Sequence, residues 1–349
     1  MPSSPSLTQQ RRVEFAPRIR SLLDEHLGDE VFRLDPGTVG VGSAGLIEQV
    51  MASRPANDFE RPTFKPLLGR AIPRTEASAV MRAVGQDVRA ALAEPTDLSA
   101  DLAGSWPRVA HTYLRDTVFG QDPRRLKVLV DRRLEWTPKL TWTVIGVGAG
   151  LPGRGGALAR TSRLGAGTAE ASTYGERRHA MGMYRRAAAP VCFTVSALVA
   201  NALWLGAPFA PGTPNRHIIH ESLRLLPVSW NVLRVASPEF TALDERVGPT
   251  DDVLMLPLLS HRDPALWDDP HVFRPERWNE LDPETAPGYL PFGHANERCW
   301  GRHMVLPLAE RLLDIARHNG LAPDPRQTAA RVPLAGLMSV VDVRMRSTR

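Results

Sequence analysis

The sequence predicts a mainly α fold with small β-sheets, in a single domain over residues 1–349. Apolar residues recur at three- and four-residue intervals in most of the long stretches, which is the spacing of amphipathic helices. Strand-like runs are short and lie near the two ends of the chain and around residue 253. No internal repeat and no clear linker divides the chain, and 349 residues are enough to enclose one large core.

The composition excludes several classes of protein. The net charge is +5, and only three of the 43 basic residues are lysines, with no block of basic residues, so we expect no nucleic-acid binding. Two cysteines, Cys192 and Cys299, cannot build a disulfide framework, which favours a reduced compartment. The first residues lack the apolar segment of a secretion signal, so we expect a cytoplasmic protein.

The first half of the chain is expected to be helical after one early pair of strands. Residues 1–30 should form a polar N-terminal segment and a first helix, because RIRSLLDEHLG has helical spacing. The stretch from Val31 to Pro55 predicts a strand, a turn, a second short strand and a helix that ends before the proline. Further helices are expected over residues 63–72, 75–94, 106–120 and 124–136.

The glycine-rich residues 146–167 are expected to form a mobile loop. Within them, Gly148, Gly150 and Gly153 match G-x-G-x-x-G, the fingerprint of dinucleotide-binding units. Pro152 and more glycines follow, and no alternating series of strands and helices surrounds them. A loop is therefore favoured over a dinucleotide site.

The uncharged stretch from Ala187 to Asn215 allows two interpretations. Its segment AAAPVCFTVSALVANALWLG is long enough to cross a bilayer. It is rich in alanine, however, it carries Ser196 and Asn201, and Pro190 interrupts it early. We therefore expect a helix buried in a soluble core and no membrane contact.

The last third should alternate helices with irregular segments. Pro-punctuated residues 261–278 are expected to be irregular, and apolar runs near the end suggest a few terminal strands. Helices are expected over residues 215–227 and 302–318, and a strand within residues 251–260.

The most specific pattern is FGHANERCWG, from Phe292 to Gly301. Cys299 lies between a turn that Gly293 marks and an amphipathic helix that begins directly after it. The start of a helix offers free backbone N–H groups and the positive end of the helix dipole, and both favour thiolate over thiol. A thiolate held there, with glycine allowing close approach of a flat ligand, suits axial ligation of haem iron.

At these residues the chain resembles the cytochrome P450 family, whose haem loop reads F-x-x-G-x-x-x-C-x-G. In the same order, Glu221 and Arg224 match the family's E-x-x-R, and Arg277 in FRPERW matches the arginine that completes a Glu–Arg–Arg network. The resemblance runs from about Val31 to the C-terminus. It implies the P450 fold, with haem b buried between the central helix and the cysteine loop and Cys299 as the iron ligand.

The resemblance also implies which residues surround the haem. The family's H-x-x-x-R falls on Arg61 and Lys65, and Arg234 matches the basic residue after the E-x-x-R helix, so these three are expected to bind the propionates. The residues of the cysteine loop expected to contact the haem are Phe292, Gly293, His294, Arg298 and Gly301.

The chain also departs from the family. Ala295 stands where the loop usually has a glycine, and Glu297 stands where a basic residue is usual, with Arg298 adjacent. Residues 53–63 leave no room for the substrate-covering helix usually found there, which predicts an open pocket or one closed by a partner or a bulky substrate.

The central helix lacks the acid–alcohol pair that delivers protons to iron-bound dioxygen in the family. The best match is APVCFT, in which Pro190 replaces a glycine, Cys192 the acid and Phe193 the first threonine. Thr194 retains the only hydroxyl and is the candidate for proton delivery. A buried thiol stays neutral, so Cys192 is a poor substitute for the acid.

Three functions follow from the resemblance. The first is a bacterial-type monooxygenase of specialised metabolism, which oxidises a small organic substrate, free or tethered to a carrier protein, with electrons from a ferredoxin and its reductase. The second is a haem enzyme that does not activate dioxygen, such as a peroxygenase, isomerase, dehydratase or cyclase. The third is a non-catalytic helper of another biosynthetic enzyme, against which the intact cysteine argues.

Overall fold

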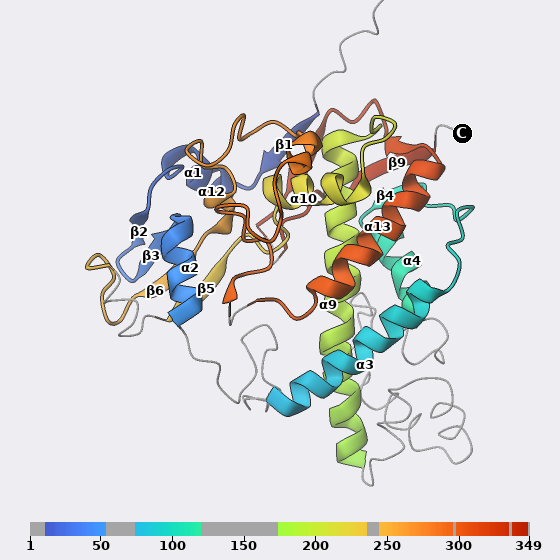
Figure 1. Ribbon diagram of the computed structural model, residues 1–349, viewed down its shortest axis with the longest axis horizontal. Coiled ribbons are helices and arrows are strands. Elements are labelled where there is room, and N and C mark those ends of the chain that lie inside the picture. The colour runs from blue at the N-terminus through green and yellow to red at the C-terminus, as the bar shows by residue number, and fades with distance from the viewer. Residues whose placement is uncertain are drawn as a thin grey trace, which may run out of the picture.

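The computed structural model describes residues 11–53, 74–119, 174–235, 244–295, 298–334 and 337–347 (Figure 1). Its helices are α1 (Pro17–Glu25), α2 (Ala44–Ser53), α3 (Arg74–Ala93), α4 (Arg108–Phe119), α9 (Tyr174–Gly206), α10 (Asn215–Leu225), α12 (Pro257–Ser260), the 3-10 helix η1 (Pro275–Asn279) and α13 (Arg302–His318). Its strands are β1 (Arg12–Phe15), β2 (Val31–Asp35), β3 (Thr38–Val41), β4 (Gly104–Trp106), β5 (Val232–Val235), β6 (Asp252–Met255), β7 (Leu321–Pro323), β8 (Ala329–Val332) and β9 (Val343–Ser347).

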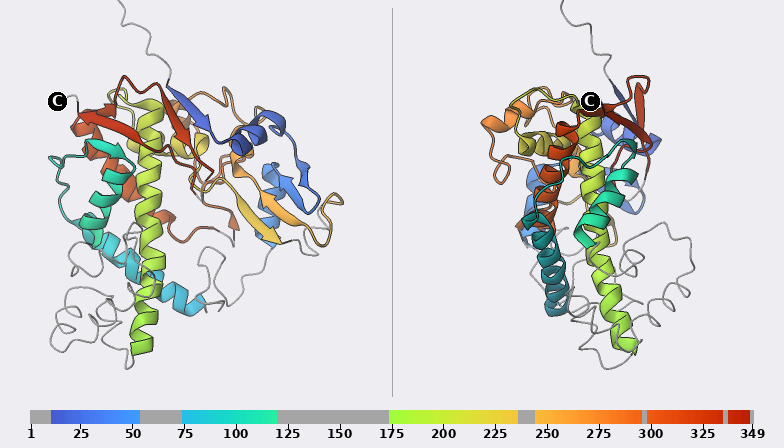
Figure 2. Two further views of the ribbon diagram at one scale, coloured as in Figure 1. Left: turned by 180° about the vertical axis from the view of Figure 1, so that it is seen from behind. Right: turned by 90° about the vertical axis from the view of Figure 1, so that its right-hand side faces the viewer.

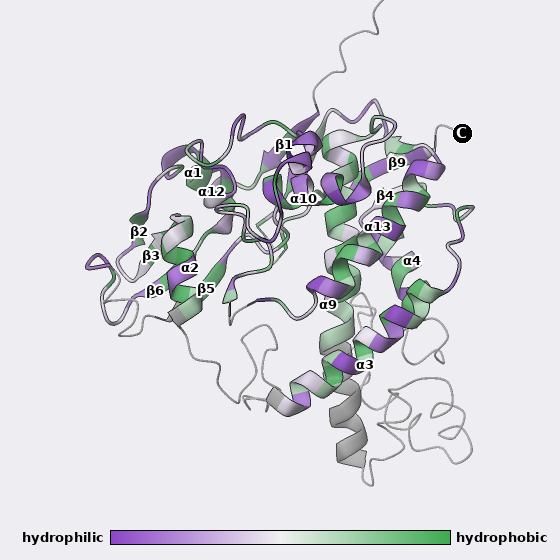
Figure 3. Cartoon of the chain, in the orientation of Figure 1, coloured by the Kyte–Doolittle hydropathy of each residue, from purple (hydrophilic) through white to green (hydrophobic). Residues whose placement is uncertain are grey.

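The long helix α9 is the centre of the helical part of the molecule. It packs against α3, α4, α10 and α13, and Figures 1 and 2 show it running the full height of this part. Its described side chains are mostly apolar and buried, and much of the described part of the helix is green in Figure 3. Burial on several sides explains why the segment carries almost no polar face.

The stretch Ala187–Gly206 of α9 is long and apolar enough to cross a membrane, and 78% of its most apolar window is buried within the protein. Asn201 donates its side-chain amide to the carbonyls of Leu226 and Met338 and accepts from the N–H of Val340. A buried amide with all these partners ties the helix to neighbouring segments of the same chain. These contacts account for the apolar stretch as the core helix that we expected.

A second body is a four-stranded sheet of order β2-β3-β6-β5, beside α2 (Figure 1). Strands β2 and β3 form the expected pair, and β6 adds parallel to β3 with Thr38 opposite Asp252. Gly40 allows the pair to close, because a Cβ there would lie 2.4 Å from the ring of Phe32. A small core of valines, Ile47 and Met255 fills the space between this sheet and α2.

Residues 12–15, within the N-terminal segment expected to be polar, form a strand that was not expected. These residues form β1, which pairs in parallel with β8, with Arg12 opposite Ala329 and Phe15 opposite Val332. Exposed and partly buried side chains alternate along the strand, so its polar and apolar residues lie on opposite faces. A four-residue strand with a distant partner carries too little local signal to be found from sequence.

The helices expected over residues 75–94, 106–120, 215–227 and 302–318 are present as α3, α4, α10 and α13 to within a few residues, and terminal strands are present as expected. The short helices α12 and η1 and the start of α9 at Tyr174 were not expected. Strand β4 was not expected; it pairs with β9, which also pairs with β7. The helices expected over residues 63–72 and 124–136 and the glycine-rich loop over residues 146–167 lie outside the described residues.

Candidate functional site

The cysteine loop is a tight turn that ends at the start of α13. Gly293 has φ +74°, in the left-handed region that glycine adopts without strain, and its N–H donates to the carbonyl of Leu290 over 3.2 Å. The N–H of Cys299 donates to the carbonyl of Phe292 over 2.7 Å, which folds the cysteine back over the turn. The ring of Phe292 packs against the main core. These bonds fix where the thiol leaves the backbone.

The Cys299 side chain is free of any disulfide, and the residue is exposed. The N–H of Gly301 lies 3.3 Å from its Sγ, and Gly301 itself is the N-cap residue of α13 without a side-chain cap. The sulfur therefore lies where a 17-residue helix begins and where backbone N–H groups are available. This environment stabilises a thiolate and fits a sulfur ligand to a haem iron.

Ala295 stands where the family's loop usually has a glycine. Its φ is +44°, so the backbone keeps a left-handed conformation that a residue with a Cβ rarely adopts. The N–H of Arg298 donates to the carbonyl of Ala295 over 3.2 Å and closes the turn. The loop thus keeps the conformation that favours glycine although the glycine is gone.

Two further residues of the loop have partners within the protein. Arg298 lies 3.0 Å from the carboxylate of Glu284, which Arg302 also contacts at 3.0 Å. The backbone N–H of His294 lies 3.2 Å from the sulfur of Met51 in α2. Arg298 and Arg302 therefore share one exposed carboxylate.

Glu221 lies at the centre of a buried network. Its carboxylate accepts from Nε and Nη2 of Arg224 over 3.1 and 2.7 Å, and from Nε of Arg277 over 3.1 Å. Arg224 also donates to the carbonyls of His261, Pro270 and Val272 over 2.7–3.1 Å. The structure thus brings together the three residues that the sequence grouped, and the two arginines share one buried carboxylate.

Sequence reasoning missed Trp278 in this network. Its indole N–H donates to Oε2 of Glu221 over 3.1 Å, and the backbone N–H of Arg274 donates to Oε1 over 3.0 Å. A signal was present, because Trp278 directly follows Arg277 in the stretch FRPERW. Tryptophan buried beside charged residues usually finds an acceptor for its N–H.

The predicted acid position of α9 faces away from the exposed part of the helix. Cys192 is buried in the core, where burial raises its pKa to about 12 although Arg115 of α4 lowers it. Phe193 stacks on His111 of α4 with ring centroids 4.2 Å apart. Both side chains are therefore turned toward α4, and neither can serve as a proton donor.

Pro190 and Thr194 mark the other side of α9. Pro190 is exposed and Thr194 is partly exposed. Four residues apart on a helix, they share one face. Thr194 is thus the one hydroxyl of the APVCFT segment that lies on the accessible side.

The expected propionate ligands are only partly described. Arg61 and Lys65 lie outside the described residues. Arg234 belongs to β5, where its backbone pairs with Val253 of β6, and its side chain lies outside the description. Among the described residues, no cluster of three or more His, Cys, Asp or Glu forms a metal site.

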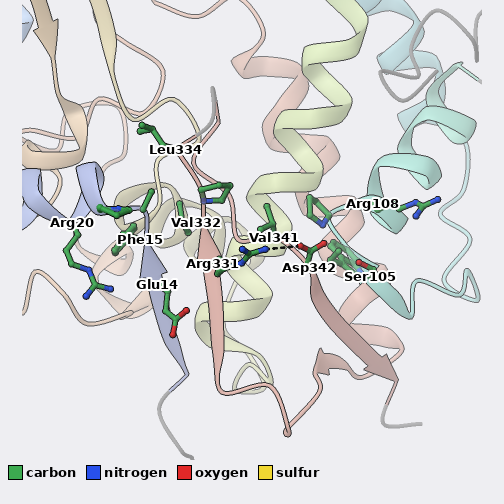
Figure 4. A pocket seen from close by; sticks show the side chains of 15 residues that line it. Glu14, Phe15, Arg20, Ser105, Arg108, Arg331, Val332, Leu334, Val341 and Asp342 are labelled. Carbon is green, nitrogen blue, oxygen red and sulfur yellow. Dashed lines mark ion pairs between the residues drawn. The ribbon is translucent and has the colours of Figure 1, made fainter. Parts of the chain in front are cut away.

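Two cavities lie beside β1, neither of them lined by the cysteine loop. One of about 840 Å³ is lined by residues of β1, α1, β4 and β8, and Figure 4 shows Glu14, Arg20 and Arg108 around it. Its Arg331 and Asp342 form an exposed ion pair of 3.6 Å. The other has about 910 Å³ and shares Phe15 and Arg20 with the first.

Residues 216–306 match the cytochrome P450 family model. The chain is 36% identical over 103 residues to cyclooctatin synthase of Streptomyces melanosporofaciens, and 39% identical over 104 residues to cyclooctat-9-en-7-ol 5-monooxygenase of the same organism. Each alignment covers 29% of this chain and 22% of the relative. The aligned segments thus span about a fifth of the length of these curated relatives. Residues 216–306, which match the family model, contain the Glu221 network and Cys299.

The similarity to solved structures extends over nearly the whole chain. The himastatin post-tailoring hydroxylase HmtN matches with a TM-score of 0.62 and 15% identity, covering 95% of this chain and 97% of that one. The cytochrome P450 CYP102L1 matches with a TM-score of 0.62 and 16% identity, covering 94% and 97%. At these identities the likeness establishes the fold, which is mainly helical with small sheets, as expected.

Proposed function

The chain belongs to the cytochrome P450 superfamily, and from this premise we propose that it is a haem-thiolate monooxygenase of bacterial specialised metabolism. The observation that carries the proposal is the position of the exposed Cys299, which forms no disulfide, at the start of α13, with the Gly301 N–H 3.3 Å from its sulfur. When bound, the haem supplies oxidation at an iron to which the thiolate donates electron density.

The chain's own residues would hold haem b from several sides. Cys299 is the proposed iron ligand, and Gly293, which has no Cβ, lets a planar ligand approach the backbone of the loop closely. Phe292, His294 and Gly301 form the rest of the proposed wall. Arg61, Lys65 and Arg234 are the proposed propionate partners, and Arg298 joins them.

The substrate and the electron donors belong to the same proposal. The Streptomyces relatives and the himastatin hydroxylase support a small organic substrate. We propose that this substrate is either free or tethered to a carrier protein. A ferredoxin and its reductase would supply electrons in the cytoplasm. The proposed role of Thr194 is to hold a proton donor, such as water, on the accessible face of α9.

A second candidate function is a haem enzyme that does not activate dioxygen. The orientation of Cys192 and Phe193 toward α4 favours it, because no acidic side chain then replaces the family's acid on the accessible face. Peroxide-driven oxidation, isomerisation, dehydration or cyclisation requires no such acid.

The test begins with the haem content and the reduced carbon monoxide difference spectrum of the purified chain and of Cys299→Ser. We expect the wild type to show the red-shifted band of a thiolate ligand and the variant to lose it, with Cys192→Ser as the matched thiol control that keeps it. Product formation is then compared with a ferredoxin–reductase pair and with peroxide. Turnover with peroxide alone would favour the second candidate, and a wild type that binds no haem would leave only the non-catalytic helper.

A further inference from the structure

The side chain of Arg262 is a buried cation with an unsatisfied hydrogen-bond donor in the described part of the chain. It follows α12, is only 5% exposed, and its Nη1 has no acceptor among the described residues. Burial, with the nearby charge of Arg224, lowers the pKa of its guanidinium to about 9, although Glu221 raises it. A guanidinium buried without an acceptor is costly, and it usually marks a place where an anion belongs.

This arginine lines the cavity of about 910 Å³ beside β1. Its guanidinium carbon lies 5.8 Å from the ring centroid of Phe15, another lining residue. The volume falls within the range of small-molecule sites. Much of the wall is apolar and comes from β1, α1, α10 and the segment before η1: Val13, Phe15, Leu23, Leu27, Leu225 and Phe273.

The polar groups of the wall are mainly cationic. Arg11 and Arg20 also line the cavity, and Asp24 is the one carboxylate among the described residues around it. Arg11 is fixed in place, because it donates to the carbonyls of Trp204 and Ala207. His271 lies near enough that burial and the charge of Arg262 lower its pKa.

We propose that this cavity binds an organic acid, whose carboxylate pairs with Arg262 and whose apolar part packs against Phe15 and Phe273. A carboxylate can accept two parallel hydrogen bonds from a guanidinium, which would satisfy the orphaned donor and neutralise the buried charge. The aromatic and aliphatic wall favours an acid with a hydrocarbon tail over an inorganic anion.

The site is separate from the cysteine loop. It meets α9 at Leu205–Ala207, whereas Thr194 lies eleven residues earlier on the same helix, roughly 16 Å away along its axis. The neighbouring cavity offers no comparable cation among its described lining residues, because Arg20, Arg108 and Arg331 are all exposed and Arg331 is paired with Asp342 (Figure 4).

The test measures binding of octanoate to the full chain by calorimetry, with 1-octanol as the uncharged probe and inorganic phosphate as the anion without a tail. We expect octanoate to bind the wild type and Arg262→Gln to weaken it by at least tenfold, while octanol binding is unchanged. Arg331→Gln, in the neighbouring cavity, should bind octanoate like the wild type. If octanoate bound at the haem instead, it would shift the haem absorption, and its affinity for Arg262→Gln would equal its affinity for the wild type. This outcome would overturn the proposal.

A second variant tests the cavity independently, in case Arg262→Gln does not fold. Leu23→Trp narrows the cavity without touching Arg262, and it should abolish binding of octanoate and octanol together. The thermal unfolding of unliganded Arg262→Gln should not fall below that of the wild type, because the variant removes an uncompensated buried charge. The proposal is wrong if octanoate does not bind the wild type, if phosphate alone binds, or if both variants bind octanoate as tightly as the wild type.

Discussion

Glu221 and Arg224 form a two-point ion pair in which neither side chain has any exposed surface, with N–O distances of 3.1 and 2.7 Å. The pair lies one helical turn apart on α10 and reaches η1 through Arg277. It thereby joins α10 to the segment that precedes the cysteine loop.

The first prediction concerns the removal of this carboxylate charge. Glu221→Gln should lower the free energy of unfolding by about 3–5 kcal/mol, because two arginines are left buried without a counter-charge. Urea unfolding of both proteins measures the difference. Glu284→Gln is the matched control: its carboxylate contacts Arg298 and Arg302 at the surface, so a loss below about 1 kcal/mol is expected. Equal losses in the two variants would contradict the argument.

The second prediction uses the two left-handed residues of the cysteine loop. Gly293→Ala should destabilise the protein by about 1–2 kcal/mol, because φ is +74° and a Cβ is strained there. Ala295→Gly should be neutral or stabilising, since relief of the strain at φ +44° offsets the entropy that glycine loses on folding. Denaturant midpoints of the two variants give the comparison. A marked loss of stability in Ala295→Gly would show that its backbone is not left-handed.

The third prediction separates the two thiols. In haem-free protein at pH 8, iodoacetamide should modify Cys299 rapidly, because it is exposed at the start of a helix. Cys192 should resist, since it is buried with a pKa of about 12, which leaves roughly one thiolate in 10⁴ molecules. Mass spectrometry of the tryptic peptides counts the labels. Haem loading should protect Cys299, and rapid labelling of Cys299→Ser in the folded state would contradict the buried position of Cys192.

A feature could be predicted from the sequence when the residues that form it lie close together in the chain. The helices near α9 and α13 were predictable because their apolar spacing is local. The grouping of Glu221, Arg224 and Arg277 came from the family resemblance, since residues 56 apart meet only through tertiary packing. Strand β1 was missed because its partner β8 lies more than 300 residues away, and no pattern within four residues reports that.

The orientation of the central helix α9 at the candidate site also could not be predicted from the sequence. The sequence offered Cys192 as the replacement for an acid, but the side of a helix that faces the site depends on its neighbours. The stacking of Phe193 on His111 and the burial of Cys192 fix that rotation, and they leave Thr194 on the accessible side. The sequence likewise offered no reason to single out Arg262, which lies in a stretch expected to be irregular. Whether its Nη1 has a hydrogen-bond acceptor depends on the three-dimensional structure.

The last prediction is the pH dependence of stability. His261 is fully buried, and burial with the charges of Arg224 and Arg262 lowers its pKa to about 3. Its Nε2 accepts the N–H of Leu290 over 2.8 Å, a bond that requires the neutral ring at this nitrogen. Burial lowers the pKa of His220 to about 4, and its ring contacts the Tyr289 hydroxyl at 2.9 Å.

Both histidines have their ordinary pKa of about 6.5 in the unfolded chain. Below that pH the unfolded chain therefore binds protons that the folded protein refuses, so stability is complete above pH 6.5 and falls as the pH is lowered toward 4. Each histidine should contribute about 1.4 kcal/mol per pH unit once the pH is well below 6.5. Urea unfolding between pH 7.5 and 5 measures the slope, and His261→Gln, whose amide oxygen can still accept from Leu290, should reduce it by one proton. A slope that is flat in the wild type, or unchanged in this variant, would show that the His261 ring is protonated in the folded state.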